Sequence, residues 1–327
     1  MISLGYFPRL ICLLLATGMV GYTAGTLLAS VAAPRALRRL ERAGTRLEHP
    51  DRAVRWLLGL RLFPLFSGGL FAVGCLSSFL WLEQGRGAEQ AGVGFLLCAT
   101  AGATAGGVML ARVARAAWSS RRLLRRIAAE AEELAMPQAA PALVIADAAP
   151  LLALAGVWRP RLLVSRGLLD ALTPEQLEAG LRHERAHQRA GDNWKRLLLS
   201  SVPALGLGSR LTPVERMWAR LVEWSADEGA ASGDRLRSLS LASTLITLAR
   251  LGSHSLQCST VSFLAQFGAG ADRELADRVQ RLLAVRSPAG IDRWGIGAAI
   301  GGLLLTAMLF QPAILHALHE VVEVLVH

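Results

Sequence analysis

The chain has 327 residues, of which 53% are hydrophobic and only 18% are charged, with a mean hydropathy of +0.39. Soluble domains carry about 25% charged residues, so this composition excludes an ordinary soluble protein and also a disordered one. The formal net charge is +10, but the arginines lie beside apolar stretches, where positive charge indicates membrane orientation, and we expect no direct binding of nucleic acid.

Four stretches lack charged residues for long enough to cross a bilayer, which requires about 20 apolar residues. They are Leu10–Ala33, Leu62–Leu82, Ala91–Ala111 and Trp294–Leu318. Water is absent from the bilayer core, so the backbone must satisfy its own hydrogen bonds, and each stretch is expected to be a helix. An alternative interpretation makes the first stretch a cleaved signal peptide.

The distribution of arginine predicts how these helices cross the membrane. Residues 34–61 contain eight arginines and three acidic residues, and six arginines follow the third stretch before the next acidic residue. Because positive loops stay in the cytoplasm, we expect a multi-pass protein of the cell (inner) membrane with an external N-terminus, a cytoplasmic block at 112–293 and an external C-terminal tail. The predicted domains are an N-terminal membrane domain with three helices (1–114), a cytoplasmic domain (115–291) and a fourth helix with a short external tail (292–327).

Three of the four stretches carry glycines four residues apart. The pairs are Gly21 with Gly25, Gly102 with Gly106, and Gly297 with Gly301. Small residues at this spacing let helix backbones approach closely in lipid. We favour packing among the helices of this chain, and a homodimer seam is the alternative.

The cytoplasmic block mixes helix and strand signals. We expect a helix at 115–134, a linker at 136–141 with two prolines, strands at 142–145 and 161–165, and mostly helix over 234–285 with a looser stretch at 252–259. Residues 197–208 are uncharged but too short to cross a bilayer. They form either a core helix or, as we prefer, a segment seated in the membrane surface.

Two helices of this block have strong start signals. Thr173–Gln176 reads Thr-Pro-Glu-Gln, a capping box with proline at the first helical position, and predicts a helix from Pro174 to about Arg189. Thr212–Glu215 repeats the pattern and predicts a second helix through about Glu228, ended by the glycines that follow. The residues with chemical potential lie on these two helices.

The first of these helices carries the sequence His183-Glu184-Arg185-Ala186-His187. Residues i and i+4 are about 40° apart around a helix, so both imidazoles project from one face and can hold one ion. Nitrogen and carboxylate ligands suit Zn²⁺, which keeps one position for water in catalytic sites. Glu184 can take a proton from that water without binding the ion. The alternative is a set of surface residues without a metal.

The second helix supplies a third ligand. Glu223 and Asp227 are also i and i+4, so they share a face. Glu223 can complete a His/His/Glu set, and Asp227 can accept the free N–H of His183 and so orient the ring. A solvated acidic face is the alternative. The cysteines do not contribute, since no pair has the spacing of a metal site or a disulfide framework.

These motifs resemble the integral-membrane gluzin metallopeptidases. The resemblance rests on Leu172–Leu177, the HERAH motif, the Gly191-Asp192-Asn193 sequence, the Glu223–Asp227 pair and the segment Gly156–Val164. The sequence is most similar to the BlaR/MecR-type family, and the HtpX-type and CAAX-prenyl-protease type are the second choice.

The resemblance implies a mainly α membrane protein whose four transmembrane helices carry a cytoplasmic α+β zincin domain. It implies Zn²⁺ held by His183, His187 and Glu223, with Glu184 and Asp227 as catalytic residues. In the BlaR/MecR type the cleaved partner is a transcriptional repressor, and an external penicillin-binding domain follows the last helix. Only about ten residues follow the fourth stretch here, so we expect no such sensor domain.

The residue that would stabilise the oxyanion is less obvious. The only tyrosines, Tyr6 and Tyr22, belong to the N-terminal membrane region, which excludes a tyrosine donor. The candidates are His254, with a loop histidine as the alternative, and Arg278, which lies in a segment similar to a late segment of these peptidases, with a structural ion pair as the alternative. The strand at 161–165 is a candidate for pairing with the substrate backbone at a sheet edge.

The sequence thus predicts a membrane-anchored zinc endopeptidase that cleaves a cytoplasmic or membrane-associated protein, in signal transduction through a repressor. An HtpX-like protease of membrane quality control and an inactive zinc-binding scaffold are the alternatives.

Overall fold

The computed structural model describes residues 2–3, 6–82, 90–136, 139–203, 208–251, 271–284, 316–318, 320–321 and 323. Within these residues, three helices are long and apolar enough to cross a membrane: α1 (Tyr6–Ala43), α2 (Pro50–Leu82) and α3 (Val93–Glu130). Helices α1 and α2 contain the first two predicted stretches, and α3 covers the third from Val93 on, since Ala91 lies in the short strand β2 (Gln90–Ala91). The predicted fourth, Trp294–Leu318, lies outside the described residues except for its last three. The division into domains stays a prediction.

Glycines set the contacts between these helices. A Cβ atom added to Gly21 or Gly25 of α1 would overlap with α2, and one added to Gly102 of α3 would overlap with the backbone of Leu15 in α1. An added Cβ on Gly106 would meet nothing within 4 Å. Gly21 and Gly25 therefore serve packing between helices of this chain, which is the interpretation that we favour. The third pair lies outside the described residues.

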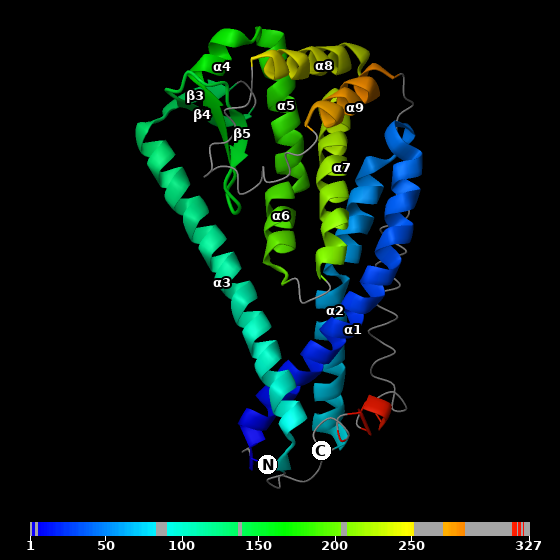
Figure 1. Ribbon diagram of the computed structural model, residues 1–327. Coiled ribbons are helices and arrows are strands. Elements are labelled where there is room, and N and C mark those ends of the chain that lie inside the picture. Colours follow the sequence, from blue (N-terminus) through cyan, green and yellow to red (C-terminus); the bar gives the residue numbers. More distant parts are fainter. Residues whose placement is uncertain are drawn as a thin grey trace.

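Helix α3 meets α1 near its N-terminal end and diverges from α1 and α2 toward its C-terminal end (Figure 1). It ends at Glu130, four residues before the end of the predicted helix. The linker predicted at 136–141 is wrong, because strands β3 (Glu132–Met136) and β4 (Ala139–Ile145) occupy most of that range as an antiparallel pair. Pro141 lies in β4 before that strand begins to pair with β6 at Leu143, a position where a strand tolerates proline.

A four-stranded sheet follows α3. Strand β6 (Arg161–Ser165) has the predicted bounds, β4 contains the other predicted strand, and β5 (Leu152–Ala155) was not predicted. The strand order is β3-β4-β6-β5, with β4 and β6 parallel and the other pairs antiparallel. Because β6 is paired on both sides, it has no free edge, and the predicted pairing of 161–165 with a substrate is wrong.

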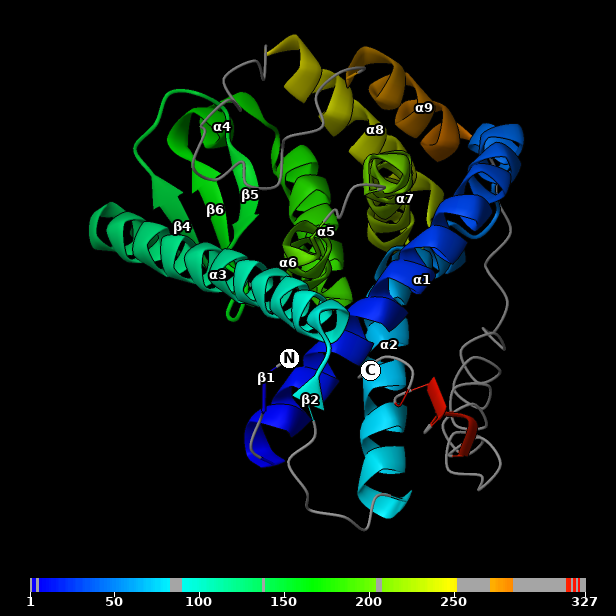
Figure 2. The same ribbon diagram turned by 60° about the horizontal axis from the view of Figure 1, so that its bottom comes forward.

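The sheet is packed on both faces, as Figure 2 shows. Side chains alternate between faces along each strand. One set contacts the end of α3, with Leu143 and Leu163 against Leu124. The other set contacts α4 (Arg166–Ala171) and α5 (Pro174–Ala190), with Val164 in the same core as Leu168.

The predicted capping box of α5 is confirmed. The Thr173 hydroxyl accepts from the Gln176 backbone N–H, and the Gln176 side chain accepts from the Thr173 N–H. The helix ends at Gly191, whose φ of +67° is in the left-handed region that glycine tolerates best. Helix α6 (Asp192–Ser201) begins immediately after it.

The second predicted cap is wrong. Helix α7 (Thr212–Ala231) continues from a 3₁₀ turn at Gly208–Leu211, and no side chain caps its N-terminus. It passes through Gly229 and ends at Ala231. Helices α8 (Arg235–Arg250) and α9 (Ala271–Leu283) confirm the helical prediction for their ranges, and the looser stretch at 252–259 lies outside the described residues.

The largest buried core joins the membrane helices to α6 and α7. Trp218, Leu221 and Trp224 of α7 pack in one cluster with Ala33 of α1 and Leu57 of α2. The predicted apolar segment 197–208 begins as the last turns of α6, and residues 204–207 lie outside the described part. The C-terminal end of α6 and the N-terminal end of α7 therefore pack against α1 and α2, at the lower end of both helices in Figure 1.

Candidate metal centre

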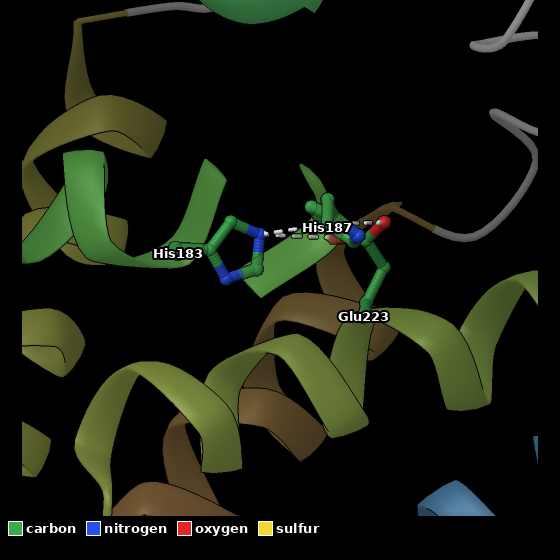
Figure 3. A group of neighbouring side chains, drawn as sticks. All are labelled: His183, His187 and Glu223. Carbon is green, nitrogen blue, oxygen red and sulfur yellow. Dashed lines mark hydrogen bonds and ion pairs between the residues drawn. The ribbon is translucent and has the colours of Figure 1, made fainter. Parts of the chain in front are cut away.

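His183 and His187 of α5 and Glu223 of α7 converge on one point. One ligand atom from each lies within 4.8 Å of the others. The Nε2 atoms of the two histidines are 3.1 Å apart, and the carboxylate oxygens of Glu223 lie 3.4 Å from His183 Nε2 and 3.5 Å from His187 Nε2. Both histidines are buried, and Figure 3 shows the three side chains pointing toward one another. The predicted ligand set is confirmed.

The orientation of the two imidazole rings suits the binding of a metal ion. Each Nε2 faces the other ligands, while each Nδ1 faces a carboxylate. Zinc sites commonly pair a ligating imidazole in this way, because the carboxylate fixes the tautomer that leaves the other nitrogen free to bind. Two imidazoles and one carboxylate are a ligand set of catalytic zinc sites, with a fourth position for water.

The partner of His183 is Asp227, as predicted. His183 Nδ1 lies 3.0 Å from Oδ1 of Asp227. Arg278 of α9 donates to both oxygens of Asp227, at 2.8 Å and 2.7 Å, which is the bidentate geometry that suits guanidinium and carboxylate. Of the two predicted oxyanion candidates, Arg278 therefore lies in the site, and His254 lies outside the described residues.

The partner of His187 was not predicted. Its Nδ1 lies 2.8 Å from Oδ2 of Asp192, the first residue of α6. The other oxygen of Asp192 accepts from Lys195 at 2.9 Å. Asp192 is part of the motif that supports the family resemblance, but nothing in its spacing indicates that it contacts His187.

Two arginines contact Glu223 from different helices. Arg196 of α6 donates to Oε1 at 3.0 Å, and Nη1 of Arg278 lies 3.4 Å from Oε2. Neither contact was predicted. The carboxylate is thus held from both sides while it faces the histidines.

Residues 117–255 match Peptidase family M48. This segment is similar to the peptidases of that family, and together with the ligand set the similarity shows a zinc metallopeptidase. The match covers the end of α3, the sheet and α4 to α8, and it leaves α1, α2 and α9 outside. It supports the HtpX-type, which was our second choice, rather than the BlaR/MecR-type. No curated protein and no solved structure matches the chain.

The electrostatics of the site favour a positive charge between the three ligands. Burial alone would lower the pKa of His187, but Asp192 and Glu223 outweigh it and raise the pKa to about 10. Burial would raise the pKa of Glu223, and its contacts with His183 and His187 instead hold it well below the usual range. The carboxylates therefore favour positive charge at this point, and a bound cation would supply it.

Glu184 is not one of the three residues that could hold the metal ion. It follows His183 on α5 and is partly buried. Burial raises the pKa of its carboxyl, while the nearby histidines oppose that shift. A carboxylate with a raised pKa is suited to exchanging protons, and the catalytic role of Glu184 stays a prediction.

Proposed function

We propose that this protein is a membrane-embedded zinc endopeptidase that cleaves proteins at the cytoplasmic face, in segments close to the bilayer. The observation that carries the proposal is the short distance along α7 between its contact with the membrane helices and the zinc ligand Glu223.

The contact is made near the N-terminal end of α7. Glu215 pairs with Arg61 of α2, the residue directly before the uncharged stretch that begins at Leu62. The preceding chain lies deeper, since the Tyr22 hydroxyl of α1 donates to the carbonyl of Pro203 at 2.5 Å. Glu223 follows Glu215 by eight residues, or about 12 Å of helix at 1.5 Å per residue. A substrate segment bound there lies within a few residues of a membrane anchor.

Each residue of the site has a definite task in hydrolysis. A bound Zn²⁺ supplies a Lewis acid that lowers the pKa of water toward about 7 and polarises the substrate carbonyl. Glu184 accepts the proton of the attacking water and returns it to the leaving amine. Asp227 holds the His183 ring, and Arg278 holds Asp227 and presents positive charge beside Glu223.

The cytoplasmic orientation rests on the arginines of 34–61 and of the segment after the third stretch. It is tested by introducing single cysteines at Arg46 and at Arg125 and labelling intact cells with a membrane-impermeant thiol reagent. We expect both positions to label only after the membrane is opened. Labelling in intact cells would reverse the orientation and place the zinc site outside.

Two substrate classes are compatible with a site of this kind. The M48 match favours a quality-control protease that acts on many membrane-associated proteins. The resemblance to the BlaR/MecR type favours one discrete target, a transcriptional repressor. An inactive scaffold is disfavoured by Glu184, which a merely structural zinc site does not need.

Substrate trapping distinguishes these functions. The Glu184→Gln protein is expressed in its native cell, cross-linked and purified, with the Glu184→Gln, Glu223→Ala double variant as a control that lacks a zinc ligand. We expect proteins that bind the first variant and not the second. Many membrane proteins would support quality control, one repressor would support signalling, and equal binding to both variants would contradict the peptidase proposal.

A further inference from the structure

The only lysine of the chain lies beside the zinc ligands. Of 35 basic residues, 34 are arginine and one is Lys195. Its Nζ donates to Oδ1 of Asp192 at 2.9 Å, while Oδ2 of Asp192 lies 2.8 Å from Nδ1 of His187. Asp192 is only 3% exposed, so its carboxylate is shared between these two partners and is largely shielded from water.

The backbone is shaped to make this contact. On one continuous helix, residues 187 and 192 would lie about 140° apart and could not meet. Gly191, with φ of +67°, interrupts the helix between α5 and α6, so the angular spacing of a continuous helix does not apply and the Asp192 carboxylate reaches the His187 ring. The amide of Asn193 donates to the carbonyls of Leu154 and Gly156, and so fastens the start of α6 to the sheet.

The arrangement repeats the one at the other histidine. His183 faces Asp227, which is held by Arg278, and His187 faces Asp192, which is held by Lys195. A carboxylate on Nδ1 selects the tautomer whose Nε2 lone pair is free for the metal and raises the basicity of the ring. A cation on the far side keeps that carboxylate ionised and in place.

We propose that Asp192 and Lys195 form a positioning pair that orients His187 for zinc. The proposal rests on the zinc site and is independent of which substrate is cleaved. The competing interpretation is that Asp192 only stabilises the N-terminus of α6, where negative charge is favourable, with Lys195 as a partner one turn later. That role would affect folding but not the affinity for zinc.

The test measures zinc affinity directly, by competition with a fluorescent chelator, on the purified full-length protein. Asp192→Asn keeps the shape of the side chain and removes its charge, and we expect a 10- to 100-fold loss of affinity. Lys195→Gln should give a smaller loss, and Lys195→Arg should recover most of it. Asp170→Asn, an exposed change on α4, is the matched control and should bind as the native protein does.

Native affinity in both Asp192→Asn and Lys195→Gln would overturn the proposal. If Asp192→Asn does not fold, Lys195→Gln decides, because the Lys195 side chain is one-quarter exposed and Asp192 keeps its contact with His187 in that variant. If the native protein itself binds no zinc, the zinc assignment fails as well. If it binds zinc normally and the variants do too, only the positioning role fails.

Because Lys195 is the only lysine of the chain, NMR spectroscopy can follow its side chain by selective labelling. Reductive methylation with ¹³C-formaldehyde labels Lys195 and the N-terminal amine alone, and the Lys195→Arg protein identifies which resonance belongs to the side chain. We expect that resonance to shift when Zn²⁺ is added to the native protein and to stay in place in Asp192→Asn. An unchanged resonance in the native protein during confirmed zinc binding would show that Lys195 is not coupled to the metal.

Discussion

Arg61 of α2 and Glu215 of α7 form an ion pair of 2.5 Å at the junction between the membrane helices and the peptidase domain. The Arg61 side chain is only 5% exposed, and its second nitrogen donates to the carbonyl of Val202 at the end of α6. One side chain thus joins α2 to α6 and α7, two of the helices that hold ligands of the zinc site or their partners. The membrane region is therefore part of the scaffold of that site.

Glu215→Gln should destabilise the protein by about 3 kcal/mol, because it leaves the buried guanidinium of Arg61 without its counter-charge. The measurement is the thermal midpoint of the purified protein in detergent. Asp51→Asn is the matched control on α2, since its ion pair with Arg55 is exposed and should contribute no more than about 0.5 kcal/mol. Equal shifts in the two variants would mean that the Arg61 pair has no special role.

Glu184→Gln should lower kcat/KM for a peptide substrate by at least about 100-fold while zinc content stays at the native level, because the variant loses the proton acceptor and keeps every ligand. Activity and bound zinc are measured on the same preparation. Glu178→Gln, which changes an exposed residue of the same helix, should leave both unchanged. Appreciable cleavage by Glu184→Gln would assign the general base to another residue.

Removal of zinc with a chelator should abolish cleavage by the native protein, and added Zn²⁺ should restore it. Glu223→Ala should not be restored at the same zinc concentration, since only two ligands remain. Elemental analysis before and after treatment checks both statements. Cleavage that persists in protein shown to be free of metal would contradict a zinc-dependent mechanism.

Gly25→Ala should destabilise the contact between α1 and α2 by about 1–3 kcal/mol, because the added methyl meets the backbone of Pro64 and the side chain of Ser67. Gly106→Ala, in the second predicted glycine pair, meets nothing within 4 Å and should be neutral. Thermal midpoints in detergent compare the two. If Gly106→Ala is the more harmful change, α3 has a partner that the described residues do not include.

The predictions that succeeded depend on short-range features of the chain. The capping box at Thr173 and the pairing of His183 with His187 follow from bonds and angles within one helix, and they can be read from residues three or four positions apart. The apolar stretches follow from composition alone. The assignment of Glu223 is the exception, since it joins the histidines to a residue on a different helix and rested on the i, i+4 spacing of Glu223 and Asp227.

The predictions that failed concern contacts between elements. Glu215 was expected to cap its own helix, but it pairs with Arg61. The strand at 161–165 was expected at an edge, but β5 pairs with it, and the Leu-Ala-Leu-Ala sequence of β5 has no β-branched or aromatic residue that would indicate a strand. In each case an arrangement that the local sequence favours is replaced by a contact with another element. That contact pairs a buried charge for Glu215 and adds a neighbouring strand for residues 161–165.

The sequence by itself determined the membrane-spanning character of the N-terminal region, the face of α5 that binds metal and the chemistry of that metal, because hydropathy and helical spacing are properties of neighbouring residues. Only the tertiary structure decided which groups besides Asp227 hold the ligands in place. Asp192, Arg196 and Arg278 reach the zinc site through the turn at Gly191 and through the packing of α6, α7 and α9. The relative positions of these helices depend on packing throughout the core, which no pattern of neighbouring residues specifies.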